Sequence, residues 1–391
     1  MKKSPRVQKT IPPLRRVKGA LSWPFASTRV RAALTQDAGA LGPVGFRLGR
    51  RWVEPFHLAP WHNEKLAPGT PALLRNLRGD FFCAPFGGNE TPYRGKRHPA
   101  HGETAQARWQ SPRLIREEGV TRLEVSLKTR IRPGLVRKRI ELRNGETVIY
   151  ERHVLEGFSG PMNPGHHANL HFPDGEGSGR ITTSRFVHGQ VFPGQFEQAA
   201  QGGYSILRPG AVFKDLRKVP RLDGGMADLT RYPARSGYED LIMLCTDPKL
   251  KLGWTAAVFL KERYVWFALK DPRVLASTVF WMSNGGRHYA PWNGRHRNVI
   301  GMEEVTSYFH SGLAESAKLN PVSRLGIPTI IRLQPRWPLV VNYIMGVAAA
   351  PAGFEEVADI VPVKGGIALL SKNGKKIFAP LRLEFLQEAT K

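Results

Sequence analysis

The chain is poor in cysteine and has no long hydrophobic run. Its 391 residues include two cysteines, Cys83 and Cys245, and neither belongs to a CxxC motif. Isolated cysteines give no disulfide framework and no thiolate metal site, so we expect a reducing compartment and a cytoplasmic protein. The longest apolar stretch, residues 338–351, is interrupted by Asn342 and is too short to span a bilayer. The basic N-terminus lacks the apolar core of a signal peptide, so we expect no contact with a membrane.

Acidic residues are scarce beside basic ones. The chain has 32 Asp and Glu against 58 Lys and Arg, a formal net charge of +26. Such a charge favours polyanionic partners, among them nucleic acid and acidic or phosphorylated sugars. Much of it is scattered, however, often at alternating strand positions such as Arg137 and Arg139, and no nucleic-acid-binding motif accompanies it. We therefore interpret it as a solvated basic surface and do not expect nucleic acid as a partner. Binding of nucleic acid through the basic N-terminus is the alternative.

Strand and turn signals dominate the chain. Residues 123–131 alternate between apolar and polar side chains, which predicts a strand with one buried face. The Asn-Gly pair at 144–145 predicts a hairpin with a type I′ turn, because both residue types tolerate positive φ. The Asn-Gly pair at 373–374 predicts a second hairpin. Only residues 311–319 have a clear helical pattern, with a possible N-cap at Ser311.

The domain organisation follows from charge and from the absence of linkers. Residues 2–31 carry nine Lys and Arg and no acid, so we expect a mobile basic tail over residues 1–24. No repeat and no Pro/Gly/Ser-rich linker divides the remainder. We expect residues 25–391 to form a single all-β domain with few short helices.

Three segments are rich in His, Trp, Asn, Arg and Glu and have little regular periodicity. They cover residues 77–109, 164–173 and 289–304. Aromatic rings can cover the apolar face of a pyranose, while amides, guanidinium groups and carboxylates bind its hydroxyls. A histidine paired with a carboxylate also provides acid–base chemistry near neutral pH. These segments predict a sugar-binding cleft.

The same three segments resemble, in order, those of the aldose 1-epimerases (galactose mutarotases) and the related hexose-6-phosphate epimerases. His101-Gly102, followed by an Arg-Trp pair at 108–109, is similar to the HG motif of that family. The Gly-His-His run ending at His167 resembles the Gly-x-His segment, although Ala-Asn-Leu replaces Pro-Tyr-Phe after it. Residues 298–303 resemble the strand that presents the catalytic Glu, here Glu303.

The resemblance implies a galactose mutarotase-like β-supersandwich and an isomerase that needs no cofactor. Glu303 would take the proton of the anomeric hydroxyl, His167 would protonate the ring oxygen, and His101 would steady the developing charge. The substrate would be a small-molecule sugar or sugar phosphate. Further substrate contacts implied in this way are Arg78, Asn89, His166 and Asp240, and Trp292 would stack on the sugar.

Other interpretations of the same residues stay open. His167 and His171 have the HxxxH spacing of a helical metal site, but Pro164 and Pro173 disfavour a helix there, so we expect no metal. Glu303 and Glu304 would leave a strand on opposite faces, so at most one of them faces a cleft. The alternative function is a non-catalytic carbohydrate-binding protein, or a lyase or isomerase of the same fold that acts on acidic sugars.

Overall fold

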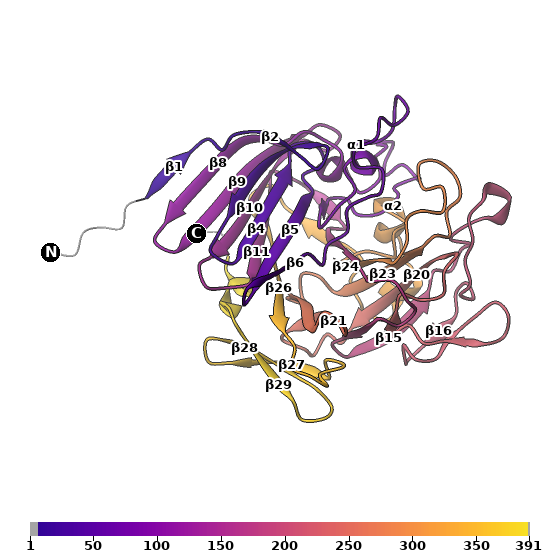
Figure 1. Cartoon of the computed structure of the whole chain (residues 1–391). Coiled ribbons are helices and arrows are strands. Elements are labelled where there is room, and N and C mark those ends of the chain that lie inside the picture. The colour runs from indigo at the N-terminus through magenta and orange to yellow at the C-terminus, as the bar shows by residue number, and fades with distance from the viewer. Residues whose placement is uncertain (1–6, 390–391) are drawn as a thin grey trace.

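Two large antiparallel sheets form the body of the molecule, and they lie side by side in Figure 1. The computed structural model describes residues 7–389. One sheet has ten strands, which in spatial order are β1 (Gln8–Thr10), β8 (Gln110–Glu117), β9 (Val120–Thr129), β10 (Gly134–Arg143), β11 (Val148–Glu156), β26 (Leu339–Ala349), β22 (Tyr264–Lys270), β21 (Gly253–Phe259), β14 (Gly179–Thr183) and β19 (Arg231–Tyr232).

The second large sheet has seven strands, and it carries the candidate site. Every residue of its central strands β23 and β24 is buried, because both faces of this sheet are covered. In spatial order the strands are β16 (Val212–Phe213), β15 (Phe186–Val191), β20 (Tyr238–Thr246), β23 (Ser277–Asn284), β24 (Val299–Val305), β13 (Gly165–His171) and β7 (Phe82–Cys83).

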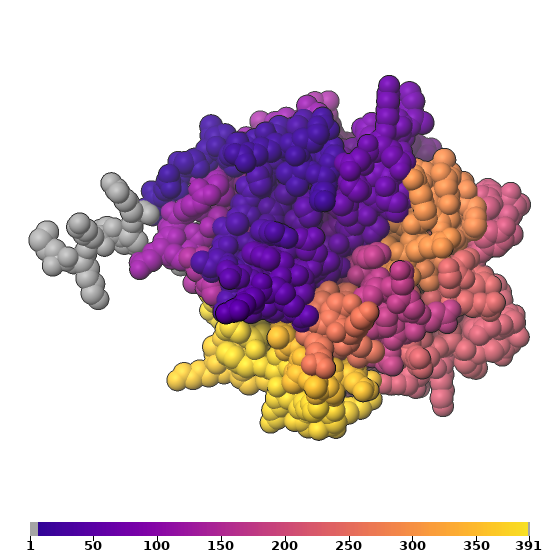
Figure 2. Space-filling view, viewed as in Figure 1, coloured from indigo at the N-terminus to yellow at the C-terminus, as the bar shows by residue number. Residues whose placement is uncertain are grey.

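Smaller sheets cover the edges of the body. Figure 2 shows the C-terminal one, in yellow, as a bulge below the N-terminal strands. It packs on the outer face of β21, β22 and β26 through a separate apolar cluster. The smaller sheets are β2 (Arg15–Val17), β3 (Ala20–Ala26), β4 (Val30–Thr35), β5 (Leu41–Leu48) and β6 (Arg51–Val53); β27 (Asp359–Val363), β28 (Gly366–Leu370) and β29 (Lys376–Pro380); and the pairs β12 (Gly160–Met162) with β25 (Ile331–Leu333) and β17 (Val219–Pro220) with β18 (Met226–Ala227).

Helices are short throughout the described part of the chain. The helix expected over residues 311–319 is confirmed as α2 (Leu313–Ala317), but it begins after Gly312 rather than at Ser311. The other helical segments are α1 (Ala72–Arg75), α3 (Pro321–Arg324) and the 3-10 turns η1 (Glu103–Ala105), η2 (Ala199–Gln201) and η3 (Leu383–Gln387). Between residues 7 and 389, no helix is long and apolar enough to cross a membrane.

The N-terminal segment is more ordered than its composition suggests. β1 pairs with β8 and β2 pairs with β3, so most of the residues from Gln8 onward that were expected to form a tail belong to the sheets. The side chains of β1 are all exposed, which lets a basic sequence add to an open sheet edge through backbone hydrogen bonds alone. Residues 1–6 lie outside the described part of the chain. The assignment of residues 25–391 to a single domain stays a prediction.

Both predicted hairpins are confirmed, since β10 pairs with β11 and β28 pairs with β29. The type I′ turn at residues 144–145 is wrong. Gly145 has a φ of +84°, but Asn144 does not have positive φ. The side-chain oxygen of Asn144 instead accepts a hydrogen bond from the backbone N–H of Thr28 (3.1 Å), and Gly145 N–H donates to the Thr28 hydroxyl (2.9 Å). Hydrogen bonds to a neighbouring turn therefore override the local preference of Asn-Gly for a type I′ turn.

Arg137 and Arg139 of β10 lie on an outer face of the ten-stranded sheet and have acidic neighbours, whereas Lys138 between them is buried. Arg137 contacts Glu156 and Arg139 contacts Glu124, each at 2.9 Å. These pairs neutralise the alternating arginines locally, which fits a solvated surface better than a site for a polyanion.

The main apolar core lies between the two large sheets. Ala168 and Leu170 of β13, and Ile300 and Met302 of β24, point into it. Glu304 lies on the same side of β24, where it forms an ion pair with Lys270 of β22. Both side chains are about 1% exposed. The hydroxyls of Thr255 and Thr278 donate to the Glu304 carboxylate at 2.9 and 2.7 Å.

We predict that this buried pair contributes strongly to stability only while both partners are present. Lys270→Met should lower the free energy of unfolding by about 3–5 kcal/mol, because it leaves the Glu304 charge buried and unpaired. Adding Glu304→Leu should recover part of that loss. Urea denaturation measures both effects. Lys318→Met, which breaks an exposed pair with Glu315, is the control and should change stability by less than about 0.5 kcal/mol. A Lys270→Met protein as stable as the wild type would contradict the prediction.

Candidate active site

A pocket of about 260 Å³ lies on the face of the seven-stranded sheet that points away from the main core. Neighbouring strands contribute His167 (β13), Glu303 (β24), Trp281 (β23) and Leu241 (β20) to its lining. Loops outside the strands complete the pocket, and one of them supplies His101. The pocket therefore brings together the first and third of the polar segments seen in the sequence, with β13 of the second between them.

His167 and Glu303 are direct neighbours in this pocket. They face each other in the antiparallel register of β13 and β24. His167 Nε2 and Glu303 Oε1 are 3.1 Å apart, and the two side chains are 6% and 2% exposed. This is an acid–base pair within hydrogen-bond distance at the wall of a pocket.

A glycine leaves space for the pair, and an aromatic ring packs against its imidazole. A Cβ atom at Gly301 would lie 2.6 Å from Glu303 Oε1 and 3.1 Å from His167 Cε1, so a side chain there would displace one of them. The ring of Phe81 stacks on the His167 imidazole with 4.4 Å between centroids. The backbone N–H of His167 donates to Phe81 O at 3.0 Å. Packing and backbone hydrogen bonding thus hold the imidazole in place.

Burial opposes charge on both members of the pair. It raises the pKa of Glu303 well above its usual range. It lowers the pKa of His167 well below the usual value, with a smaller contribution from His101. A neutral carboxylic acid beside a neutral imidazole holds one titratable proton, on the carboxyl group. A carboxylate beside an imidazolium also holds one, on the imidazole. The pair therefore carries one proton in either form near neutral pH.

His101 stands beside this pair on a tight loop. Its imidazole lies 5.1 Å from that of His167 between centroids, and its backbone N–H donates to Gly87 O at 2.7 Å. Its Nδ1 is 3.4 Å from Cys83 Sγ and 3.5 Å from Gly87 N. Burial raises the pKa of the Cys83 thiol, so the S–H group is available as a donor to Nδ1. This arrangement leaves the proton of a neutral His101 on Nε2.

Two tryptophans and one arginine form another part of the pocket wall, next to the pair. Trp281 and Trp292 meet edge to face at 5.9 Å between centroids. The Arg287 guanidinium lies 4.7 Å from the centroid of Trp292. Arg287 Nε is 2.6 Å from a Glu197 carboxylate oxygen and 3.9 Å from one of Glu239. The positive charge of this wall is thus balanced by two buried carboxylates.

Half of the expected site residues line the pocket. The structure places His101, His167, Glu303 and Trp292 in its wall, and it places Arg78, Asn89, His166 and Asp240 outside it.

The side chains of Arg78 and Asn89 form hydrogen bonds to backbone groups of other segments. Arg78 is fully buried, donates from Nη1 to Val17 O at 3.2 Å, and packs its stem against Gly42. Asn89 spans the loop that carries His101 and the start of α2, where its side-chain oxygen accepts from Leu313 N at 2.9 Å. Neither side chain lines the pocket. Backbone groups occupy the amide of Asn89 and accept from Nε and Nη1 of Arg78, so sugar contacts by these two residues stay a prediction that the pocket does not support.

His166 and Asp240 face away from the pocket because neighbouring residues on a strand alternate. His166 points into the core, where its Nδ1 is 2.9 Å from Asp80 Oδ2. Asp240 accepts a hydrogen bond from Leu207 N at 3.0 Å and borders a different cavity. Its neighbour Glu239 is the acid that reaches the pocket side, where it accepts from the Trp281 indole at 3.0 Å.

The lining residues that were not anticipated from the sequence include Phe81, Trp281, Arg287 and His310. Phe81 lies inside the first polar segment, and Arg287 lies two residues before the third. Trp281 ends an apolar strand pattern in which nothing distinguishes a pocket-facing residue from a core one. The sequence signal for Phe81 was the composition of its segment, which does not single out one position, and Arg287 lies outside the segments that this composition marks.

Comparison with known proteins supports the fold and goes no further. No protein-family model matches the chain, and no curated protein matches it in sequence. Among solved structures, a putative aldose 1-epimerase from Klebsiella pneumoniae has a TM-score of 0.56 at 13% identity and covers 87% of this chain and 83% of its own. A putative aldose 1-epimerase from Escherichia coli K12 has a TM-score of 0.53 at 11% identity, covering 88% and 100%.

A galactose mutarotase related enzyme from Lactobacillus acidophilus also has a TM-score of 0.53 at 11% identity, covering 84% of this chain and 98% of its own. These similarities extend over most of each chain. The protein has the galactose mutarotase-like all-β fold that the sequence predicted. At such low identity the likeness establishes the fold alone.

We predict that His101 makes the protein sensitive to acid. Burial, with a smaller effect of His310, lowers the pKa of His101 to about 3. An unfolded histidine has a pKa of about 6.5, so its contribution to stability is full above that pH and is lost as the pH falls toward 3. Urea titrations between about pH 4 and 6 should give His101→Gln a shallower dependence of unfolding free energy on pH, by up to about one proton.

The same two proteins compared at about pH 8 provide the internal control, since the histidine is neutral there in both states. Any difference at that pH reports packing rather than titration. Equal slopes for wild type and His101→Gln in acid would show that the imidazole titrates normally in the folded protein.

Proposed function

We propose that the pocket binds a monosaccharide and that the protein is an aldose 1-epimerase-type isomerase, which interconverts the anomers of a hexose by opening and closing its ring. The observation that carries this proposal is the contact between His167 and Glu303 at the pocket wall, 3.1 Å apart, with His101 beside them. The shared fold with putative aldose 1-epimerases supports it.

The spacing of the pair suits the two oxygens involved. In a cyclic sugar the ring oxygen and the anomeric hydroxyl are bonded to the same carbon, so the groups that exchange protons with them must also be neighbours. Glu303 takes the proton of the anomeric hydroxyl while His167 gives its proton to the ring oxygen. The bond between the anomeric carbon and the ring oxygen breaks, and an open-chain aldehyde forms.

Ring closure on the other face of the aldehyde reverses both transfers. The pair starts with its one proton on His167 and holds it on Glu303 while the sugar is open, so no proton is exchanged with solvent. This cycle needs a base and an acid that share a single proton. Burial opposes charge on both groups and so favours the form with that proton on Glu303, and the bound sugar must stabilise the form with the proton on His167 before the ring opens. His101, with its proton on Nε2, can donate a hydrogen bond to the same oxygens.

The lining favours a neutral sugar of one ring. A volume of about 260 Å³ is below the roughly 300–1,000 Å³ typical of pockets for drug-sized ligands, so an oligosaccharide would not fit inside. Trp281 and Trp292 offer aromatic faces to the apolar side of a pyranose. Arg287 is the one arginine or lysine among the described residues that line the pocket, and Glu197 and Glu239 already neutralise it. A phosphate or uronate would find no free cation there.

Polarimetry of freshly dissolved α-glucose or α-galactose tests the proposal. The wild type should accelerate mutarotation over buffer. His167→Ala and Glu303→Gln should each lower the rate by about 10²–10⁴-fold, the usual contribution of a positioned proton-transfer group. His171→Ala, at the exposed end of the same strand, is the matched control and should keep full activity. Folded wild-type protein that accelerates no hexose would falsify the proposal.

Substrate choice gives a second prediction. We expect a higher kcat/KM for a free hexose than for the same hexose 6-phosphate, because the pocket has no unpaired cation for the phosphate. Coupled assays with the two sugars measure the ratio. A preference for the phosphorylated sugar would contradict the assignment of Arg287 to a neutralised ion-pair network.

A further inference from the structure

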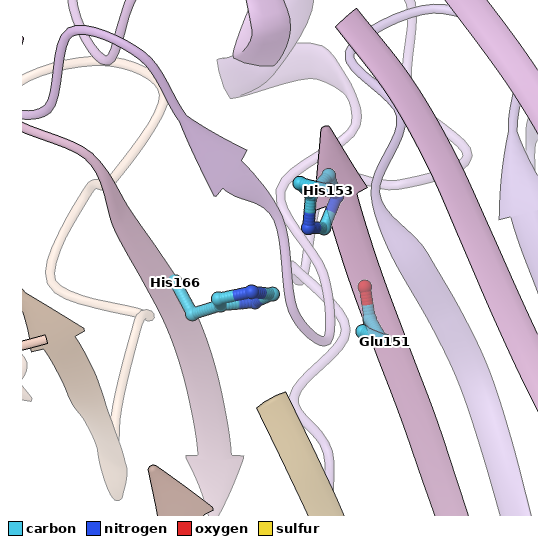
Figure 3. A group of neighbouring side chains, drawn as sticks. All are labelled: Glu151, His153 and His166. Atoms are coloured by element: carbon cyan, nitrogen blue, oxygen red, sulfur yellow. The ribbon is translucent and has the colours of Figure 1, made fainter. Parts of the chain in front are cut away.

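A second group of polar side chains lies in the core directly behind the pocket. His166 extends from β13 of the seven-stranded sheet toward Glu151 and His153 on β11 of the ten-stranded sheet, as Figure 3 shows. One nitrogen from each histidine and one carboxylate oxygen all lie within 4.8 Å of one another. Two imidazoles and a carboxylate thus converge on one point between the sheets.

These donor atoms have no partner among the described residues. All three side chains are fully buried. Both carboxylate oxygens of Glu151, both ring nitrogens of His153 and Nε2 of His166 make no hydrogen bond to any residue from 7 to 389. Buried polar atoms are nearly always satisfied in folded proteins, and leaving five of them unsatisfied in one place is costly. A bound species that accepts all three ligands would remove that cost.

The surrounding side chains orient the histidines as metal sites do. His166 Nδ1 is 2.9 Å from Asp80 Oδ2, so Nδ1–H can donate to the carboxylate and leave the Nε2 lone pair free. Metal-binding histidines commonly use their other nitrogen in this way. Phe82 stacks on the His153 ring at 3.9 Å and 6° between planes, and Tyr343 lies against His166 at 4.2 Å. Both rings are held rigidly.

The local charge also favours a cation. Asp80 and Glu151 are two buried acids in the same region, and Lys138 is the nearby base. Lys138 Nζ is 4.0 Å from Glu151 Oε2, beyond hydrogen-bond distance, and it donates instead to Gly39 O at 2.7 Å. Lys138 can balance one of the two carboxylates, and either a proton on Glu151 or a bound cation can balance the other.

We propose that Glu151, His153 and His166 bind one divalent transition-metal ion, such as zinc, which joins the two large sheets. The ligand set of two histidines and a carboxylate is one that zinc and iron(II) accept. Zinc–ligand distances of about 2.0–2.2 Å require the donor atoms to close by a small side-chain movement. The ion would be structural, because its ligands are sealed in the core and none lines the pocket. It would also fix β13 next to His167.

Metal content of the full-length protein tests the proposal directly. Protein from medium supplemented with zinc should retain about one equivalent through gel filtration, measured by atomic emission. Glu151→Gln and His153→Gln should lose it, and Asp80→Asn should bind about 10–100-fold more weakly because the orientation of His166 is lost. His98→Gln is the control: His98 is also buried with a bare Nε2, but it lies outside the group.

A spectroscopic measurement on the wild type tests the proposal even if the variants fail to fold. Protein grown with cobalt should show d–d absorption, and its X-ray absorption spectrum should contain imidazole scattering from two histidines. Folded wild-type protein that takes up neither zinc nor cobalt would overturn the proposal, as would metal retained equally by Glu151→Gln. Neither readout depends on sugar turnover, so the metal site and the proposed isomerase activity stand or fall separately.

Discussion

On β13 and β24, successive side chains must leave the sheet on opposite faces, and each strand carries two like residues in succession. His166 and Glu304 point into the core, while His167 and Glu303 point into the pocket. The backbone pairing that sets His167 opposite Glu303 also sets His166 opposite Glu304. Two chemically similar pairs therefore have separate environments, and everything that distinguishes them comes from what each face of the sheet packs against.

The pocket shows what such an environment does to ordinary side chains. Its walls are mostly aromatic and aliphatic, and water is largely kept from Glu303 and His167. The low polarity raises the pKa of the carboxyl group and lowers that of the imidazole, so it opposes a charge on either member of the pair. Arg287 could have disturbed this balance, but the carboxylates of Glu197 and Glu239 lie beside its guanidinium and offset its charge.

Local signals predicted local structure well. Asn-Gly pairs gave both hairpins, and the order of polar segments gave the fold and four residues of the pocket. The errors concern side chains whose contacts are determined by residues far away in the sequence. Arg78 is occupied by a carbonyl of β2, which no spacing in the sequence reveals. Asp240 was inferred from the family resemblance of its segment, and that resemblance does not show that Glu239, rather than Asp240, lies on the pocket face of β20. The donor group of Glu151, His153 and His166 is likewise assembled from separate sheets.

The repeated residue types on β13 and β24 have a consequence for how the strands find their alignment. If β13 slipped by one residue against its neighbours, His167 would take the place of His166, and a histidine would still face Asp80. The slip would be costly elsewhere, because Asn169 and His171 would replace Ala168 and Leu170 in the apolar core. The apolar side chains of β13 therefore set the strand register, and with it which of two consecutive histidines becomes available to a ligand.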